Sequence, residues 1–121
     1  LMFPSKPDHP FVYWATLSYV GELIMAGANC YTYDNGFLHA KGLSIDGKAC
    51  CYGTANMDIR SFALNFEVNA MIFDQNIAGE MERIFREDLK CCTRITKEMY
   101  KSRSVWIRFK EQISRLLSPV L

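Results

Sequence analysis

Two side chains that can do chemistry on a phosphate group, His39 and Lys41, stand two positions apart in the sequence. Side chains at positions i and i+2 of a β-strand point to the same face, so a strand here would place the imidazole beside the ammonium. The ammonium can pair with a non-bridging phosphate oxygen while the imidazole attacks phosphorus or protonates a leaving oxygen. A histidine without such a neighbour is more often structural, and the spacing is what favours a catalytic His39.

Further polar residues follow at a turn and in the loop beyond it. Asp46 comes five positions after Lys41, and this odd spacing predicts that Asp46 points to the opposite face of a regular strand, where it would stabilise the turn. Beyond the return strand, Gly53 permits a close backbone approach, and Thr54 and Asn56 can donate hydrogen bonds to phosphate oxygens. A turn-stabilising role for Thr54 and Asn56 is the alternative.

The pattern of apolar residues predicts a mixed α/β chain. Apolar residues at helical spacing indicate helices, and alternation bounded by turn residues indicates strands. The predicted strands are 1–4, 30–33, 37–45, 48–52 and 66–73, and the predicted helices are about 10–28, 77–89 and 103–117. Asp46-Gly47 is the strongest hairpin signal. We expect one domain over residues 1–121, a mixed β-sheet flanked by helices, with the site at one end of the sheet.

Composition is that of an ordinary globular protein and says little about partners. The formal net charge is +1, so charge alone points to neither a nucleic acid nor a membrane. The five cysteines form two adjacent pairs and one single residue, a pattern typical of neither a disulfide framework nor a zinc site. We interpret them as reduced thiols that act as small core residues.

The apolar stretch 11–28 is about as long as a membrane span but contains Glu22. A carboxylate in the middle of a spanning helix costs about 2.5–3.5 kcal/mol, so we expect a buried helix of a soluble domain, which Asp8 can cap. Residues 1–4 have the pattern of a strand already in progress. We therefore expect the chain to be a piece of a longer protein.

Six residues fit the spacing H-x-K-x4-D-x6-G-[ST]-x-N: His39, Lys41, Asp46, Gly53, Thr54 and Asn56. This spacing is the signature of the phospholipase D superfamily, which the chain resembles over essentially its whole length. The segments 57–62, 64–69, 6–9 and 109–121 resemble the bacterial cardiolipin synthase branch in particular. By this resemblance, Leu121 corresponds to the natural end of the parent protein.

The resemblance implies a site built at an interface from two such motifs, of which this chain carries one. One histidine attacks phosphorus and forms a phosphohistidine, and the other protonates the leaving alcohol and then deprotonates the acceptor. In cardiolipin synthases one phosphatidylglycerol supplies the phosphatidyl group, and a second accepts it with release of glycerol. The family assigns the acid–base role to the histidine of the second motif, which would be His39. No metal or other cofactor is implied, because two lysines and polar donors cover the phosphate.

The resemblance also implies the partners and the location of the parent protein. The partners are phosphatidylglycerol, the membrane surface and an N-terminal half that carries the first motif, with no nucleic acid. The parent would lie at the bacterial cell membrane, and this chain would be a soluble domain without a spanning segment.

Glu67, 28 residues after His39, matches the carboxylate that orients the motif histidine in superfamily members. A neutral imidazole needs an acceptor that holds its second nitrogen. An ion pair with Arg60 is the alternative for Glu67. Asp58 and Arg60 could equally form a structural ion pair or contact the substrate.

Two other functions fit a chain with one motif. The first is a phosphodiesterase or nuclease that completes its site by forming a homodimer, although the weak net charge argues against a nucleic-acid substrate. The second is a folded but inert half-domain, and for the isolated chain inertness is the expectation.

The C-terminal helix combines Trp106 and Phe109 with Arg103 and Arg108. Such a mixture can lie at a membrane interface. Packing on the domain through the apolar stripe is the favoured alternative, and a solvent-exposed Trp106 would favour the interface instead.

Overall fold

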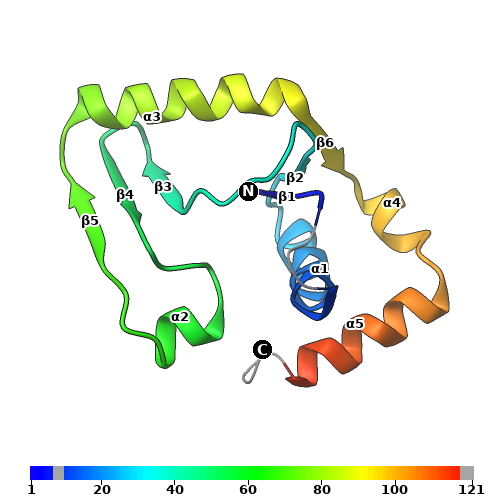
Figure 1. The fold of residues 1–121 in the computed structure, drawn as a ribbon. Helices are drawn as coiled ribbons and strands as arrows, with labels where there is room; N and C mark the ends of the chain where they lie inside the picture. The colour runs from blue at the N-terminus through cyan, green and yellow to red at the C-terminus, as the bar shows by residue number, and fades with distance from the viewer. Residues whose placement is uncertain (7–9, 118–121) are drawn as a thin grey trace. The chain divides into compact units, whose positions relative to one another are not determined.

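The computed structural model describes residues 1–6 and 10–117 and confirms the predicted mixed α/β class (Figure 1). Within those residues the chain forms five α-helices and two three-stranded sheets. It divides into two compact units, one made of Leu1–Leu38 with Cys91–Leu121 and the other of His39–Lys90. The single domain expected from the sequence stays a prediction, and each unit is described by itself.

The first unit is built around a mixed sheet with the strand order β1-β2-β6. Strand β1 (Met2–Pro4) runs parallel to β2 (Cys30–Tyr33), and helix α1 (Pro10–Met25) connects them. Strand β6 (Cys92–Ile95) is antiparallel to β2. The predicted cap of α1, Asp8, lies outside the described residues. Helix and sheet share a small apolar core of Val20, Ile24 and Cys30, with Phe3, Ala28 and Ile95 packed against it.

Helices α4 (Lys97–Lys101) and α5 (Val105–Leu117) complete the first unit, and α5 packs along α1. The α5 side chains that are buried are polar ones, Glu111 and Ser114. Glu111 forms an ion pair with Arg103. Burial raises the pKa of Glu111, and the positive charge of Arg103 opposes this rise. In the part of the chain that the structure describes, no helix is both long and apolar enough to cross a membrane.

The orientation of α5 contradicts the favoured prediction that its apolar stripe packs on the domain. Trp106 and Leu116 are 74% and 82% exposed, whereas Glu111 is 1% exposed. The ion pair between Glu111 and Arg103 holds the polar side of the helix inward, and the apolar stripe is therefore turned outward. Apolar periodicity locates a stripe on a helix but does not determine which side the rest of the unit covers.

The second unit contains an antiparallel sheet with the strand order β3-β4-β5. Strands β3 (Gly42–Ile45) and β4 (Ala49–Gly53) form a hairpin, and β5 (Asn69–Ile72) pairs with β4. The predicted Asp46-Gly47 turn is confirmed. Its two residues have φ angles of 52° and 62°, and positive values at both positions are what a two-residue hairpin turn of type I′ requires.

Helix α3 (Gln75–Asp88) lies against β3 and β4 and confirms the helix predicted from residue 77 onward. It begins after Asp74, whose carboxylate accepts hydrogen bonds from the backbone N–H groups of Asn76 and Ile77 at 2.8 and 2.9 Å. Such a cap satisfies amide groups that have no partner inside the helix. The sheet and α3 thus form the scaffold on which the candidate site is placed.

Several elements differ from their prediction. The strands predicted over 37–45 and 66–73 begin only at Gly42 and Asn69, so His39, Lys41 and Glu67 lie outside any strand. The loop expected after the return strand contains a short helix, α2 (Ile59–Ala63), and α2, α4 and β6 were not predicted at all. Each has four or five residues, which is too short for a periodic pattern to become visible.

Removing the buried carboxylate of the first unit tests how α5 is held. We expect Glu111→Ala to lower the free energy of unfolding by about 3 kcal/mol, because it empties a buried site and leaves the half-buried Arg103 without its carboxylate partner. Urea denaturation followed by circular dichroism measures the change. The matched control is Glu22→Ala, which removes an exposed partner of Arg115 and should cost about 1 kcal/mol or less. Equal losses would contradict the assigned role of Glu111.

Candidate active site

The structure brings the two residues of the predicted phosphate site together. The ammonium nitrogen Nζ of Lys41 lies 3.0 Å from Nε2 of His39, and Nζ also donates a hydrogen bond to the His39 carbonyl oxygen at 3.3 Å. The alternation of a strand does not produce this contact, because both residues precede β3. An ammonium can only donate, so the contact fits an imidazole whose Nε2 carries no proton and accepts. In this state the imidazole can act as a base.

The backbone of Lys41 is tied to the second part of the signature. The Gly53 N–H donates to the Lys41 carbonyl oxygen at 3.3 Å, which extends the β3–β4 pairing by one step toward His39. A Cβ atom on Gly53 would overlap the carbonyl oxygen of Val68 and the side-chain oxygen of Asn69. The sequence predicted a close backbone approach at Gly53. In the structure, the group that approaches Gly53 is the chain's own segment at Val68 and Asn69.

Thr54 forms hydrogen bonds across the same close approach. Its N–H donates to the Val68 carbonyl oxygen at 3.0 Å, and its hydroxyl oxygen accepts from the Val68 N–H at 2.9 Å. The Ala55 N–H donates to Oδ1 of Asn69 at 3.3 Å. These bonds support the structural alternative for Thr54, which fastens the motif loop to the residues that lead into β5. A phosphate contact by Thr54 stays a prediction.

The rest of the motif loop is held by its own polar side chains. The Asn56 N–H donates to the Ser61 hydroxyl at 3.1 Å, and the Ser61 N–H donates to the Asp58 carboxylate at 2.7 Å. Asp58 thereby starts α2 in the way that a helix cap does, which is a structural role, while the side chain of Arg60 lies outside the description. The side chain of Asn56 is exposed and open to a ligand.

Glu67 is the acidic member of the site. Hydrogen bonds from Thr54, from Ser61 and from Asn65 lower its pKa below the usual range for a glutamate, and the positive charge of Lys41 acts in the same direction. The bond from Asn65 Nδ2 measures 3.4 Å. Glu67 is therefore ionised at neutral pH and interacts with the motif lysine. Its predicted role as the partner of His39 stays a prediction.

Asp46 lies at the opposite end of β3 from Lys41. The extended strand separates the two residues by about 16 Å, at about 3.3 Å per residue. Asp46 adopts a positive φ in the turn, and the turn is closed by a hydrogen bond of 2.9 Å from the Lys48 N–H to the Ile45 carbonyl oxygen. This placement agrees with a structural role for Asp46 in the hairpin.

Two contributors to the site, Ser61 and Asn65, were missed from the sequence. Their signal is weak: Ser61 in α2 and Asn65 just after it are ordinary polar residues, and only their position between the signature and Glu67 sets them apart. Among residues 1–6 and 10–117, no group of three or more His, Cys, Asp or Glu side chains is arranged to hold a metal ion.

Comparison with known proteins gives one family and a consistent set of relatives. The family described as the cardiolipin synthase, phospholipase D-like domain matches residues 1–89. The chain is 56% identical over its whole length to a cardiolipin synthase of Oceanobacillus iheyensis and 57% identical to the major cardiolipin synthase of Bacillus subtilis. It is 56% identical to a cardiolipin synthase of Staphylococcus aureus. The chain spans about a quarter of the length of these curated relatives.

The close approach at Gly53 predicts that alanine substitutions at two glycines of the second unit change stability in opposite directions. We expect Gly53→Ala to destabilise the chain by about 2 kcal/mol or more, because backbone atoms of Val68 cannot move aside as a flexible side chain would. Gly79 in α3 has open space where a Cβ would stand, and Gly79→Ala should stabilise the chain by about 0.5–1 kcal/mol. Thermal unfolding of both variants measures the difference. A Gly53→Ala variant as stable as the original chain would refute the steric constraint at Gly53.

Because a hydrogen bond from Thr54 lowers the pKa of Glu67, removing the Thr54 hydroxyl should change that pKa. Thr54→Val should raise the pKa of Glu67, because it removes the hydrogen bond that contributes most to the shift. A depressed carboxyl pKa stabilises the fold above the unfolded pKa, and this stability is lost as pH falls through the folded pKa. The variant should therefore lose less stability on acidification. Carboxyl NMR titration measures the pKa directly, with Thr93→Val in the first unit as the control.

Proposed function

The chain belongs to the family of cardiolipin synthases with a phospholipase D-like domain, and from this membership we propose that it is one half-site of a phosphatidyltransferase. The parent enzyme transfers a phosphatidyl group from one phosphatidylglycerol to another and releases glycerol. The observation that carries this proposal is the 3.0 Å contact between Lys41 and His39 inside a complete signature. It joins an acid–base group to a cation that can bind phosphate.

In the first step of the proposed reaction, a histidine of the partner motif attacks phosphorus. A P–N bond forms, and the bond from phosphorus to the glycerol oxygen breaks. His39 gives its proton to that oxygen, so that glycerol leaves as a neutral alcohol. Lys41 pairs with a non-bridging oxygen of the phosphate and stabilises the charge that develops there.

In the second step, His39 reverses its role. With Nε2 now unprotonated, it takes the proton of a hydroxyl group of the second phosphatidylglycerol. That oxygen attacks phosphorus, and the P–N bond breaks, which regenerates the partner histidine and gives cardiolipin. The 3.0 Å contact between Lys41 Nζ and His39 Nε2 supports this proposal, because an ammonium can only donate and is therefore compatible with an Nε2 that accepts.

The remaining residues of the half-site support these two. Glu67, ionised and under the influence of Lys41, is proposed to orient the motif and to hold His39 in the required tautomer. Asn56 is the stronger candidate for a further phosphate contact, because its side chain is exposed while the Thr54 hydroxyl is already bonded to Val68.

The missing half-site is proposed to come from an N-terminal half of the parent protein. The chain spans about a quarter of its relatives and carries one signature. Around that signature the second unit leaves large apolar side chains exposed, namely Met57, Phe62, Leu64, Phe66 and Val68. A surface of this kind is typical of an interface that another part of the protein covers. Its substrate places the parent at the bacterial membrane.

The same apolar surface is what a homodimeric phosphodiesterase would use, and this is the second candidate function. Two copies of one motif would then form the site without an N-terminal half. The formal net charge of +1 gives no support to a nucleic-acid substrate. In the proposed function, the isolated chain is inert.

Replacing His39 in the parent enzyme tests the proposed role. His39→Ala should lower cardiolipin formation from phosphatidylglycerol at least about 100-fold, since acid–base catalysis typically contributes that much. With a phosphodiester whose leaving group is p-nitrophenolate, which needs no proton to leave, a phosphohistidine on the partner motif should still form and accumulate, and intact mass spectrometry with phosphorus analysis detects it. Lys48→Ala, in the hairpin, is the control and should retain activity.

The other outcomes of that experiment are equally informative. Loss of both the product and the adduct would indicate that His39 is the attacking group. Unchanged cardiolipin formation would remove the motif from the reaction. Hydrolysis of a short phosphodiester by a dimer of the isolated chain would favour the second candidate.

A further inference from the structure

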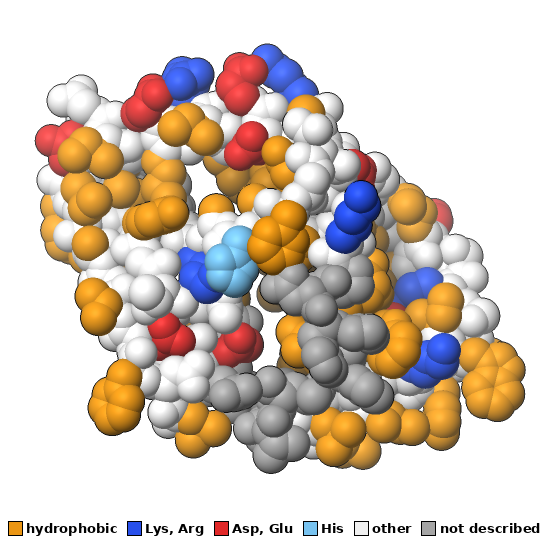
Figure 2. Space-filling view, viewed as in Figure 1, with side chains coloured by type: hydrophobic (Ala, Val, Ile, Leu, Met, Phe, Trp, Pro, Cys, Tyr) orange, Lys and Arg blue, Asp and Glu red, His pale blue; other side chains and the backbone are white. Residues whose placement is uncertain are grey.

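Helix α5 presents an apolar surface away from the rest of its unit. We define the α5 apolar face as Val105, Trp106, Phe109, Ile113, Leu116 and Leu117. At 100° per residue these six side chains fall within an arc of about 120° on the helix. All six are exposed, from 40% for Ile113 to 82% for Leu116. In Figure 2, apolar side chains gather over the region where Figure 1 draws α5.

We propose that the α5 apolar face docks onto the surface of an anionic phospholipid bilayer. The helix would lie in the plane of the interface, with Trp106 and Phe109 inserted between lipid headgroups. The choice of a bilayer as the occupant rests in part on the proposed function, because an enzyme that acts on phosphatidylglycerol works at such a surface. The arrangement of charges on α5 is an independent argument for the same occupant.

Cations border the face, and the carboxylate of α5 is turned away from it. Lys110 stands next to Leu117 on one edge of the arc, and Arg108 lies beyond the other edge at helical spacing. Both side chains are exposed, and such side chains can keep their charge at the headgroup level while their stems cover apolar surface. Between Val105 and Leu117 the only carboxylate belongs to Glu111, which is buried. The outward side is thus apolar and positive, which is complementary to an anionic bilayer.

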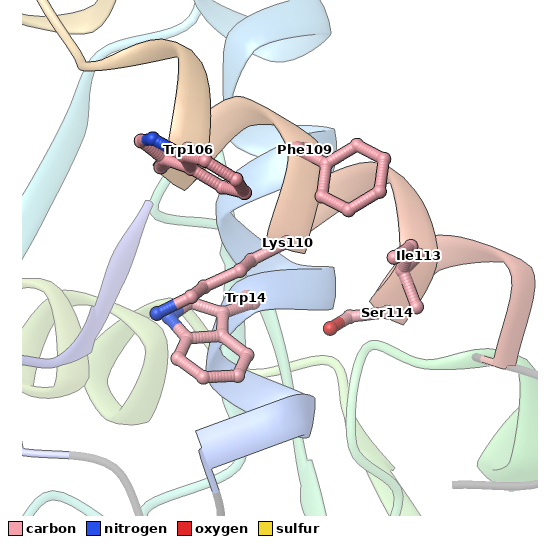
Figure 3. A pocket seen from close by; sticks show the side chains of 6 residues that line it. All are labelled: Trp14, Trp106, Phe109, Lys110, Ile113 and Ser114. Atoms are coloured by element: carbon pink, nitrogen blue, oxygen red, sulfur yellow. The ribbon is translucent and has the colours of Figure 1, made fainter.

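A pocket formed by part of the face together with Trp14 of α1 suits the hydrocarbon part of a lipid. It has a volume of about 310 Å³ and is lined by Trp14 of α1 and by Trp106, Phe109, Lys110, Ile113 and Ser114 of α5. Figure 3 shows the three aromatic rings around it, and the Lys110 ammonium lies 5.0 Å from the centre of the Trp14 ring. Among the described residues, the buried Ser114 hydroxyl has no hydrogen-bond partner. The lining that the pocket exposes is thus almost entirely apolar, which suits a hydrocarbon chain.

Tryptophan fluorescence tests the docking directly. The chain contains two tryptophans, so Trp14→Phe leaves Trp106 as the only reporter and keeps an aromatic ring in the pocket. With vesicles of equal parts phosphatidylglycerol and phosphatidylcholine, we expect a blue-shifted emission, quenching by bromine atoms on the acyl chains and protection from iodide in the water. Vesicles of phosphatidylcholine alone should bind roughly tenfold or more weakly, because the cations then lose their partners.

A matched pair of variants separates the face from the rest of the helix. Trp106→Glu should weaken vesicle binding roughly tenfold or more, because it replaces one of the two inserted aromatic rings with a charge. Gln112→Glu changes the net charge equally but lies outside the arc, and it should weaken binding by roughly threefold or less. Far-ultraviolet circular dichroism of both variants confirms that α5 is folded.

Three results would overturn the proposal. The first is no binding to the mixed vesicles. The second is binding that leaves Trp106 open to iodide, which would place the contact elsewhere. The third is protection of Trp106 without vesicles in the chain or its parent, which would show that a second copy or another part of the protein covers the face. None of these depends on phosphatidyl transfer, so a failed transfer assay with intact docking would count against the proposed function alone.

Discussion

The close approach of the Gly53 backbone to Val68 and Asn69 is the contact on which the candidate site depends. A side chain at Gly53 would overlap the Val68 carbonyl oxygen, so only glycine lets the end of β4 lie this near the residues leading into β5. Because the approach is close, Thr54 can exchange two hydrogen bonds with Val68. It also leaves the Gly53 N–H directed at the Lys41 carbonyl oxygen. The close approach at Gly53 thus positions both Lys41 and the motif loop that begins at Thr54.

The electrostatic character of the site follows from that positioning. Glu67 precedes Val68 directly, and the Val68–Thr54 bonds therefore bring its carboxylate within reach of the Thr54 hydroxyl. Hydrogen bonds to the carboxylate, together with the charge of Lys41, favour its ionised form. A negative group and the Lys41–His39 pair then share one small region of the second unit. Such a combination of opposite charges beside an imidazole is suited to binding a phosphate and moving a proton near it.

In the first unit, the short helix α5 turns its apolar side outward and is held by other contacts. The buried pair of Glu111 with Arg103 replaces the apolar contacts that usually hold an amphipathic helix. Arg103 also lies over the Tyr100 ring, and the Tyr100 hydroxyl donates to the Ser18 carbonyl oxygen of α1 at 3.4 Å. A network of polar and aromatic contacts therefore replaces an apolar seam, and the apolar residues of α5 remain available for a surface outside the unit.

The sequence alone predicted the chemistry of the candidate site and determined much of the local structure. The spacing of His39 and Lys41 was enough to predict a phosphate site, and Asp46-Gly47 was enough to predict the hairpin. Helices α3 and α5 were visible from their periodicity, and α1 from its long apolar stretch. These features depend on interactions within a few residues, which the sequence displays directly. The tertiary structure alone showed that Lys41 meets His39 without a strand, that Thr54 and Ser61 surround Glu67, and that α5 buries Glu111 rather than Trp106. The Lys41–His39 contact is local, but it forms in a segment that the periodicity had assigned to a strand. The burial of Glu111 depends on the packing of α5 along α1, which is distant in the chain. Local periodicity carries no information about which partner a side chain will meet.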